Sequence, residues 1–359
     1  MRFFLTLLIT ALLAPALPAK DRLTTELEVE IQRRAADEEF SGVVLVARAG
    51  KPLLQGAYGY ANRENKTPNS LDTRFRFGSM GKMFTAVAAL QLVQAGKLSL
   101  DAPLGKYLVD YPDKEVAAVT IEQLLTHTGG TGNIFAPEYF ERRLTTRDHQ
   151  DYLNLFGARG VAFEPGSRWD YSNYGLVLLG RVIEVVSGQS YYDFTRTHIF
   201  EPLGMSSTGN DPEDTHVRNL STGYTHMGPR PGPPGPIRPN TDTLPYRGTA
   251  AVGGYSTAGD LLKFVNGLYA HRLLDAAHTG LLLTPRMRTP RPGGEQALGF
   301  SVRTFPDGQI SVGHGGGAPG MNGELYYFPK STCLIVVLSN LDPPSASDLA
   351  DFIEARLPP

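Results

Sequence analysis

The sequence has little cysteine and almost no net charge. Its 359 residues include one cysteine, Cys333, so an internal disulfide cannot form. Cys333 opens the apolar run 333–338, which indicates a buried thiol rather than a reactive one. Lys and Arg number 34 against 36 Asp and Glu, so the overall charge favours neither nucleic acid nor an anionic membrane surface. Apolar residues make up 41% of the chain, which excludes a disordered protein.

Long hydrophobic runs are also absent after the N-terminus, so we expect no stable membrane span. The first residues have the pattern of a secretory leader, with Arg2, an apolar stretch over 3–13, and small residues that offer cleavage after Ala16 or Ala19. We therefore predict a signal peptide over 1–19 and an exported protein, periplasmic or secreted. About 340 residues remain, enough for one large domain or two moderate ones. The sequence does not indicate an oligomeric state.

Strand-like patterns lie near both ends of the chain, and helical patterns dominate between them. Strands are predicted at 41–47, 52–60, 298–304, 310–313, 323–328 and 333–338. Helices are predicted at 21–40, 83–95, 121–126, 146–156, 175–186, 191–199, 257–269 and 345–357, the last with Asp348 as the acidic partner of its cap. These patterns predict an α/β (α+β) fold: an antiparallel β-sheet built from both chain ends and flanked by helices, with an inserted, mostly helical domain.

The same patterns set the expected domain boundaries. An α/β sheet domain would comprise 20–78 and 248–359, and a helical domain would comprise 79–247. The helical domain would include a loop at 227–245, in which residues 228–239 hold six prolines and three glycines. Such a loop has no core of its own and is either a surface connection or a wall along one side of a cleft.

The first candidate for chemistry is the segment from Ser79 to Lys82, which opens the apolar helix predicted over 83–95. At a helix N-terminus the dipole stabilises negative charge that develops on the serine oxygen. Lys82 follows three residues later and so lies on the same face. Burial against an apolar helix would lower the pKa of its amine, and Lys82 could then accept the Ser79 proton. The alternative is a capping serine beside a solvated lysine.

Two further segments contain groups that a hydrolase could use. Tyr171 and Asn173 are two residues apart on an extended turn, so their side chains point the same way. A tyrosine can relay a proton, and an amide can hold a substrate carbonyl or amide. In 314–317, a histidine and three glycines end a strand, where a ligand could lie against backbone N–H groups. Alternatively, these segments are a half-buried tyrosine beside a capping asparagine, and a glycine-rich bend with a surface histidine.

Together, and in this order, the three segments resemble the motifs of the serine β-lactamase and penicillin-binding protein superfamily, in its class C-like branch. Residues 79–82 are similar to its S-x-x-K motif, 171–173 to its Y-x-N motif, and 314–316 to the H-x-G form of its third motif. Other segments also look like the family: 124–129, 164–166, 201–205 and 253–257. The resemblance extends over about residues 41–341.

The resemblance implies a serine hydrolase that works through a covalent acyl-enzyme. Ser79 would be the acylated nucleophile, and Lys82 its partner in proton transfer. Tyr171 would share the general-base role and pass a proton to the leaving group. No cofactor and no metal are implied, and the sequence contains no H-E-x-x-H or similar pair of metal ligands.

The resemblance also implies which residues bind the substrate. Asn173 would hold its carbonyl side, and His314 and Gly316 would also bind the substrate. The backbone N–H groups of Ser79 and Gly317 would form the oxyanion hole. The expected partner is a small-molecule ester, amide, peptide or β-lactam, with no role for nucleic acid.

The third motif has a histidine, His314, where many members of the family have a lysine. Histidine is mostly neutral at pH 7 unless an acid lies close. This difference weakens the case for an efficient β-lactamase and favours esters, amides or small peptides as substrates. The alternatives are a weak β-lactamase, or a non-catalytic penicillin-binding sensor or binding protein of the same fold.

An α/β-hydrolase fits the sequence poorly. That fold needs G-x-S-x-G after a strand, with an HGGG loop upstream. The segment 254–258, around Ser256, lacks the final glycine, and the HGGG segment follows it instead of preceding it. His127, which follows a predicted helix, is expected to be structural.

Overall fold

A computed structural model describes residues 19–357. The predicted signal peptide lies outside the described residues, apart from Ala19, where helix α1 (Ala19–Ala36) begins. None of the helices in this part of the chain combines the length and the apolar character that crossing a membrane requires.

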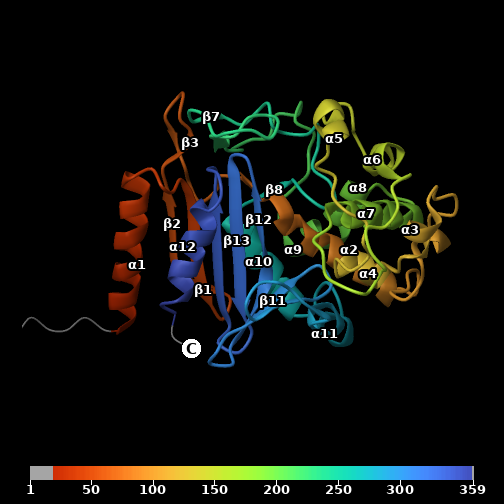
Figure 1. Ribbon diagram of the computed structural model, residues 1–359. Coiled ribbons are helices and arrows are strands. Elements are labelled where there is room, and N and C mark those ends of the chain that lie inside the picture. The colour runs from red at the N-terminus through yellow and green to blue at the C-terminus, as the bar shows by residue number, and fades with distance from the viewer. Residues whose placement is uncertain (1–18, 358–359) are drawn as a thin grey trace, which may run out of the picture.

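An antiparallel sheet of eight strands forms one half of the molecule (Figure 1). Its order is β2-β1-β14-β13-β12-β11-β10-β9. The bounds are β1 (Gly42–Arg48), β2 (Lys51–Tyr58), β9 (Met287–Arg288), β10 (Gly294–Gln296), β11 (Ser301–Thr304), β12 (Ile310–Ala318), β13 (Met321–Phe328) and β14 (Cys333–Ser339). Strand β1 pairs with β14 along its whole length, from Gly42 opposite Ser339 to Arg48 opposite Cys333. The chain ends therefore share one sheet, which confirms the predicted fold class.

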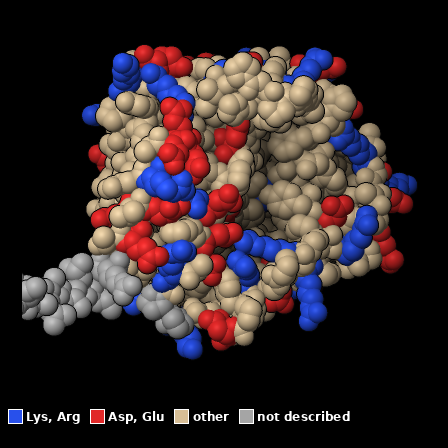
Figure 2. Space-filling view, turned by 60° about the vertical axis from the view of Figure 1, so that its left-hand side comes forward, with Lys and Arg blue, Asp and Glu red and all other residues tan. Residues whose placement is uncertain are grey.

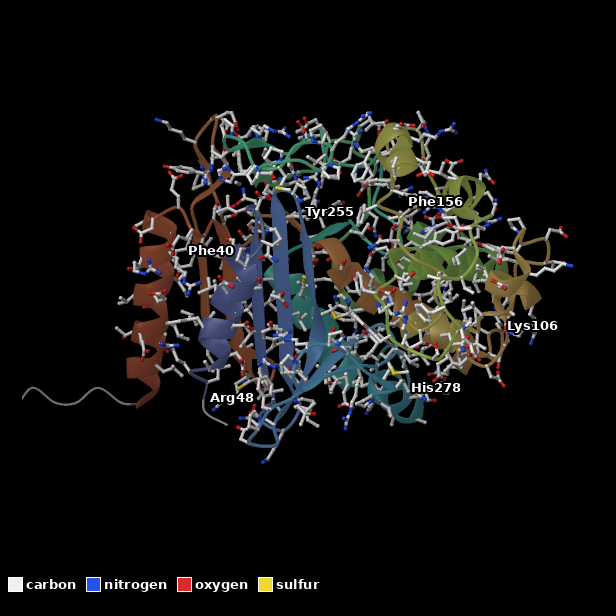
Figure 3. All side chains as sticks on the ribbon, in the orientation of Figure 1. Phe40, Arg48, Lys106, Phe156, Tyr255 and His278 are labelled. Carbon is white, nitrogen blue, oxygen red and sulfur yellow. The ribbon has the colours of Figure 1, made fainter. Side chains whose placement is uncertain are left out.

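Both faces of the sheet are covered, and this explains why its central strands are apolar throughout. All seven residues of β14 are buried, Cys333 included. Alternate residues of β14 pack into two different cores: Ile335 and Val337 face α1 and α12 (Ser345–Glu354), whereas Val336 and Leu338 face the core that holds the remaining helices. Figure 3 shows members of the two cores, with Phe40 near α1 and Phe156 among the helices.

The remaining helices lie mostly on the other side of the sheet (Figure 1). They are α2 (Lys82–Gln94), α3 (Lys114–Ala118), α4 (Ile121–Leu125), α5 (Pro137–Arg142), α6 (His149–Phe156), α7 (Asn173–Ser187), α8 (Tyr191–Thr195), α9 (Glu201–Leu203), α10 (Ala258–Tyr269) and α11 (Ala276–Leu283). Short strands complete the fold: β3 (Tyr60–Asn62), β4 (Thr67–Pro68), β5 (Phe75–Arg76), β6 (Tyr224–Thr225), β7 (Arg238–Pro239) and β8 (Tyr255–Ser256). The division into a sheet domain and a helical domain at 78/79 and 247/248 stays a prediction.

Several predicted boundaries are wrong for local reasons. Helix α1 ends at Ala36, and Glu38 takes a left-handed conformation with φ of 58° before the chain enters β1. Helix α12 ends at Glu354 and has no side-chain cap, so the capping role of Asp348 is wrong. The Ser345 hydroxyl instead donates to the carbonyl of Glu39 at 2.8 Å. The helix predicted at 191–199 is split, because a wider π-type turn at 196–200 follows α8.

Candidate active site

Ser79 lies in a tight turn, Gly78–Gly81, that leads directly into α2. It does not cap α2, whose N-terminus has no side-chain cap. Strand β12 runs against this turn so closely that only glycines fit. A Cβ atom on Gly316 would lie 2.0 Å from the carbonyl oxygen of Phe77 and 2.8 Å from the backbone nitrogen of Ser79. Gly78 has φ of 56°, and its Cβ would lie 3.0 Å from the nitrogen of Gly317. The turn that holds Ser79 thus packs directly against Gly316 and Gly317 of β12.

Lys82 is fully buried, one turn of helix beyond Ser79. Its Nζ donates to Ser79 Oγ at 3.1 Å, to Asn173 Oδ1 at 2.8 Å and to the carbonyl of Ala251 at 2.5 Å. Burial lowers the pKa of Lys82 well below its usual range. The alternative of a solvated lysine is therefore wrong. These three donated bonds describe the protonated amine. When the amine loses its proton it has a lone pair in place of one N–H, and it can then accept the proton of the half-buried Ser79 hydroxyl as a base.

Tyr171 and Asn173 flank the start of α7 and both face Lys82. The cap is Ser172, whose Oγ accepts from the backbone N–H of Gly175 at 2.9 Å, so the alternative of a capping Asn173 is wrong. Lys82 Nζ lies 4.8 Å from the centre of the Tyr171 ring. Burial raises the pKa of Tyr171 to about 12, and a hydrogen bond with the Ser79 side chain opposes part of this rise. Tyr171 therefore keeps its proton at neutral pH, which suits a relay better than a resting base.

His314 is buried, with 6% of its surface exposed, so the alternative of a surface histidine is wrong. Its Nδ1 lies 2.5 Å from the carbonyl oxygen of Gly315, which can only accept, so Nδ1 has the hydrogen. Nε2 is then a bare acceptor, and it has no hydrogen-bond partner among the described residues. Burial, and then the nearby charge of Lys82, lower the pKa of His314 to about 4. His314 is therefore a neutral acceptor beside Tyr171, with 6.4 Å between the ring centres.

His127 supports the same tyrosine from another side. Its Nδ1 accepts from the backbone N–H of Ser172 at 3.2 Å, and its ring centre lies 4.5 Å from that of Tyr171. Burial lowers the pKa of His127 well below its usual range, with smaller effects of Lys82 and His314. His127 also has a positive φ, 57°. These contacts indicate that it holds the turn before α7.

A buried histidine fixes the loop that accepts a hydrogen bond from Lys82. His149 Nε2 accepts from the backbone N–H of Ala250 at 3.0 Å, and its Nδ1 lies 2.9 Å from Glu184 Oε1. The next carbonyl in the chain, that of Ala251, is the one that contacts Lys82. Gly180 of α7 allows this approach, because a Cβ there would lie 2.6 Å from His149 Nε2. The pair of His149 and Glu184 is thus linked to the amine of Lys82 through one short loop.

We expect His149→Phe to lower kcat for a neutral ester about tenfold or more, with a smaller change in KM. The phenyl ring fills the same space but leaves the Ala250 N–H unpaired, which costs about 1–3 kcal/mol, and it frees the loop that holds Lys82. His149→Gln, which keeps an acceptor, should recover much of kcat. Steady-state kinetics and melting temperatures would separate the two effects. If His149→Phe lowered the melting temperature but left kcat unchanged, the link to Lys82 would be wrong.

The chain matches the family model described as Beta-lactamase over residues 28–357. It belongs to the β-lactamase family. A penicillin-binding protein from Bacillus halodurans is similar in structure, with a TM-score of 0.81, 30% identity and coverage of 91% of this chain and 100% of that one. A D-stereospecific amidohydrolase from Streptomyces sp. has a TM-score of 0.77 and 26% identity, covering 95% and 99%. Esterase EstB from Burkholderia gladioli is 34% identical over 202 residues, which are 52% of this chain and 51% of EstB.

Membership of the β-lactamase family confirms the resemblance drawn from the three motifs. It also excludes the α/β-hydrolase alternative. The rival serine of that alternative, Ser256, is fully buried, and its Oγ lies 2.8 Å from Thr208 Oγ1. No three His, Cys, Asp or Glu side chains gather as a metal site would require within residues 19–357.

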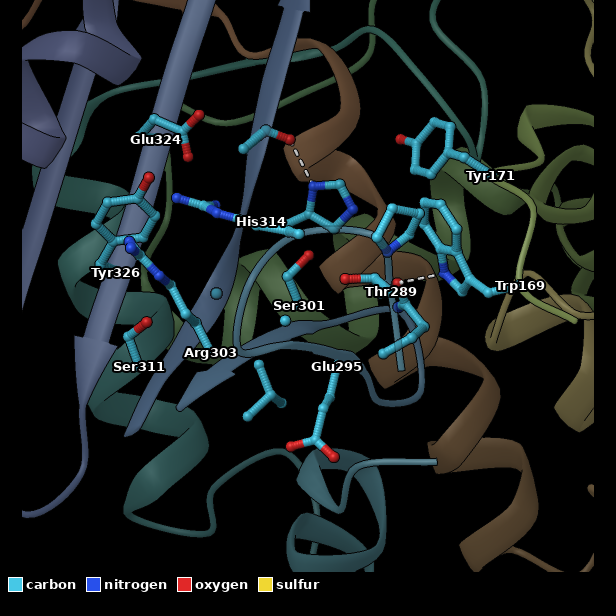
Figure 4. A pocket seen from close by; sticks show the side chains of 17 residues that line it. Trp169, Tyr171, Thr289, Glu295, Ser301, Arg303, Ser311, His314, Glu324 and Tyr326 are labelled. Carbon is cyan, nitrogen blue, oxygen red and sulfur yellow. Dashed lines mark hydrogen bonds between the residues drawn. The ribbon is translucent and has the colours of Figure 1, made fainter. Parts of the chain in front are cut away.

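Two cavities lie beside this site in the β-lactamase fold. The first, of about 360 Å³, is lined by Trp169, Tyr171 and His314, and we refer to it as the polar cavity because charged side chains such as Arg291 and Glu324 also line it (Figure 4). Burial raises the pKa of Glu324 to about 8, an effect that Arg291 partly opposes. The second cavity, of about 300 Å³, is mainly apolar. Figure 2 shows that one face of the molecule is hollowed, with many acidic and basic side chains to the left of the hollow.

Sequence reasoning missed residues that contact the site from unremarkable segments. Asn133 accepts from Asn173 Nδ2 at 3.0 Å, and its loop is rich in glycine and threonine, a pattern that could have marked it. Nothing in the sequence distinguishes Ala251, because its contribution is a backbone carbonyl. His149 lies at the start of α6, and its role depends entirely on tertiary contacts.

Proposed function

We propose that this protein is a serine hydrolase that cleaves esters and amides through an acyl group bound to Ser79. The observation that supports this most directly is the contact between Ser79 Oγ and the buried amine of Lys82. In the proposed reaction, Ser79 Oγ attacks the substrate carbonyl as its proton passes to Lys82. The N–H groups of Ser79 and Gly317 stabilise the negative oxygen that forms, and such donors are typically worth a few kcal/mol.

Tyr171 then delivers its own proton to the leaving group, which departs as an alcohol or amine, and Tyr171 regains a proton from Lys82, the one that left Ser79. Water attacks the acyl group on Ser79 in the second half of the reaction and gives up its proton by the reverse route. Asn173 holds Lys82 in the free site and has an amide group that can contact a substrate carbonyl. The leader predicted at 1–19 makes export to the periplasm or medium part of this proposal.

The state of His314 favours uncharged substrates over those with a carboxylate. A lysine at this position would offer a charged donor, whereas Nε2 of His314 offers a lone pair to whatever lies against it. A carboxylate has no hydrogen to donate to that lone pair, so His314 would not compensate the cost of its desolvation. Substrates with an N–H or O–H, or with no charge, avoid this cost. Esters and amides are therefore favoured, with β-lactams as weak substrates.

A substrate panel on the purified protein tests this function. We expect turnover of a short aryl ester or a D-alanyl amide, with kcat/KM about tenfold or more above that of a chromogenic cephalosporin. The ratio should stay flat between about pH 5.5 and about pH 6.5, because His314 remains neutral above its lowered pKa and Glu324, which lines the same cavity, stays protonated below its raised pKa. One acyl group per chain without turnover of any substrate would instead identify a penicillin-binding sensor.

His314→Lys is the variant that isolates this residue within the panel. The new charge should raise the cephalosporin-to-ester ratio about fivefold or more, since a charge-assisted bond is stronger than a neutral one. If both activities fell equally, His314 would be a structural tether, and its proposed role in specificity would be wrong.

A further inference from the structure

The two cavities meet β12 on either side of Gly316. His314 and Gly315 line the polar cavity, whereas Gly317 and the two residues after it line the apolar one. Gly253, which also lines the apolar cavity, donates its N–H to the Gly78 carbonyl at 3.2 Å. Both cavities are therefore adjacent to the turn that holds Ser79, and they approach it from opposite directions along one strand.

The placement of Tyr171 decides which part of a substrate each cavity can take. This step rests on the proposed function, in which Tyr171 protonates the leaving group. A proton donor must lie within hydrogen-bond reach of the atom that it protonates. Tyr171 and His314 both line the polar cavity, so the leaving group lies there. The acyl group must then extend past Gly317, into the apolar cavity.

The apolar cavity has the composition of a pocket for a hydrocarbon group. Its large side chains come from three separate segments: Phe135, Tyr139, Phe140, Met227, Leu244 and Met321. Prolines of the loop 227–245 form one wall, which agrees with the expectation that this loop borders a cleft. Arg230 is the one charged residue among those that line it, and it is exposed. The volume of the apolar cavity, about 300 Å³, is in the range of small-molecule sites.

We propose that the apolar cavity binds the acyl group and that the protein prefers uncharged acyl groups larger than acetyl, such as hexanoyl or phenylacetyl. Each methylene that enters an apolar pocket can raise affinity for the transition state about fourfold. An acyl group that ends in a carboxylate would bury a charge where no opposite charge is buried to compensate it, and it should be excluded.

Esters with one leaving group test the proposal in the wild-type protein. We expect kcat/KM for p-nitrophenyl hexanoate to exceed that for the acetate by about tenfold or more. The p-nitrophenyl hemisuccinate, similar in length to the pentanoate but charged, should be a much poorer substrate than the pentanoate. A flat series across the three neutral acyl lengths would overturn the proposal.

Two variants at the cavity, outside the catalytic groups, sharpen the test. Met227→Trp narrows the cavity and should lower the hexanoate-to-acetate ratio about tenfold. Phe135→Lys, at a position 44% exposed, should raise the hemisuccinate-to-pentanoate ratio about threefold. The matched controls are Val109→Trp and Leu144→Lys, which alter exposed apolar residues that line neither cavity. Equal changes in variants and controls would contradict the assignment.

Failure of this inference can be distinguished from failure of the proposed function. If the acetate ester is hydrolysed but the ratios do not respond to Met227→Trp or Phe135→Lys, the acyl assignment is wrong and the hydrolase stands. If Ser79 is never acylated, the hydrolase is wrong. The cavity can then be probed in Ser79→Ala by saturation-transfer NMR with phenylacetamide against acetamide. Saturation transfer to the phenylacetamide ring that disappears when Met227→Trp is added would support an apolar ligand site. If no transfer to the ring is seen, the apolar ligand site is wrong.

Discussion

Ser79→Ala should abolish acylation and reduce ester hydrolysis by about 10³-fold or more, because loss of the nucleophile leaves only binding and oxyanion stabilisation. The Ser79 hydroxyl is the one that Lys82 contacts, and the turn that holds Ser79 packs against Gly316 and Gly317 of β12. Intact-mass analysis after treatment with a fluorophosphonate should show one adduct on the wild-type chain and none on Ser79→Ala. The fold should not change, since Ser79 does not cap α2.

Ser256→Ala is the control for this experiment, because Ser256 is the other serine that the sequence singles out. Its hydroxyl is fully buried against Thr208 and lies in strand β8. The Ser256→Ala chain should therefore be labelled as fast as the wild type. An adduct that persists in Ser79→Ala, or that maps to Ser256, would refute the assignment of the nucleophile.

The parts of the site that the sequence predicts are those in which neighbours in the chain are neighbours in space. Ser79 and Lys82 are one helical turn apart, and Tyr171 and Asn173 flank one helix cap, so local geometry alone brings each pair together. The fold class also follows from local patterns. Alternating and continuous apolar runs near both ends of the chain predict strands there, and strands from both ends can pair in one sheet.

The remainder depends on contacts between distant segments. Strand β12 was expected to end at Gly313, because glycine is a poor strand former. It continues to Ala318, since Gly316 pairs with Gly323 of β13 and the glycines allow close approach to the Ser79 turn. The acceptors that surround Lys82 include a backbone carbonyl, which no residue type identifies. Burial of His314, and with it the choice of its tautomer, depends on the packing of β12 and cannot be inferred from the motif.

Lys82→Arg should lower kcat/KM about 10²- to 10⁴-fold, the range expected for loss of a general base. Arginine keeps the positive charge of lysine but does not give up its proton. Lys82 is placed to do so, because burial lowers the pKa of its amine. Activity of the wild type should therefore fall as pH decreases through this lowered pKa, when the amine becomes protonated. Lys263→Arg, at a surface lysine paired with Asp260, is the matched control and should retain full activity.

The larger arginine side chain at the fully buried position 82 could also disrupt packing, so Lys82→Arg needs a second variant as a check. Lys82→Ala leaves an empty space where the amine was, between Ser79 and Asn173. The melting temperature of this variant shows whether it still folds. If Lys82 is the base, small primary amines added to Lys82→Ala should restore part of the ester hydrolysis, and tetramethylammonium, which has charge but no proton to exchange, should not. If the Lys82→Arg chain stayed within a few fold of the wild type, or if tetramethylammonium rescued Lys82→Ala as well as amines do, the role of Lys82 would be electrostatic. Proton transfer from Ser79 would then fall to Tyr171, whose raised pKa would place the optimum of hydrolysis at alkaline pH.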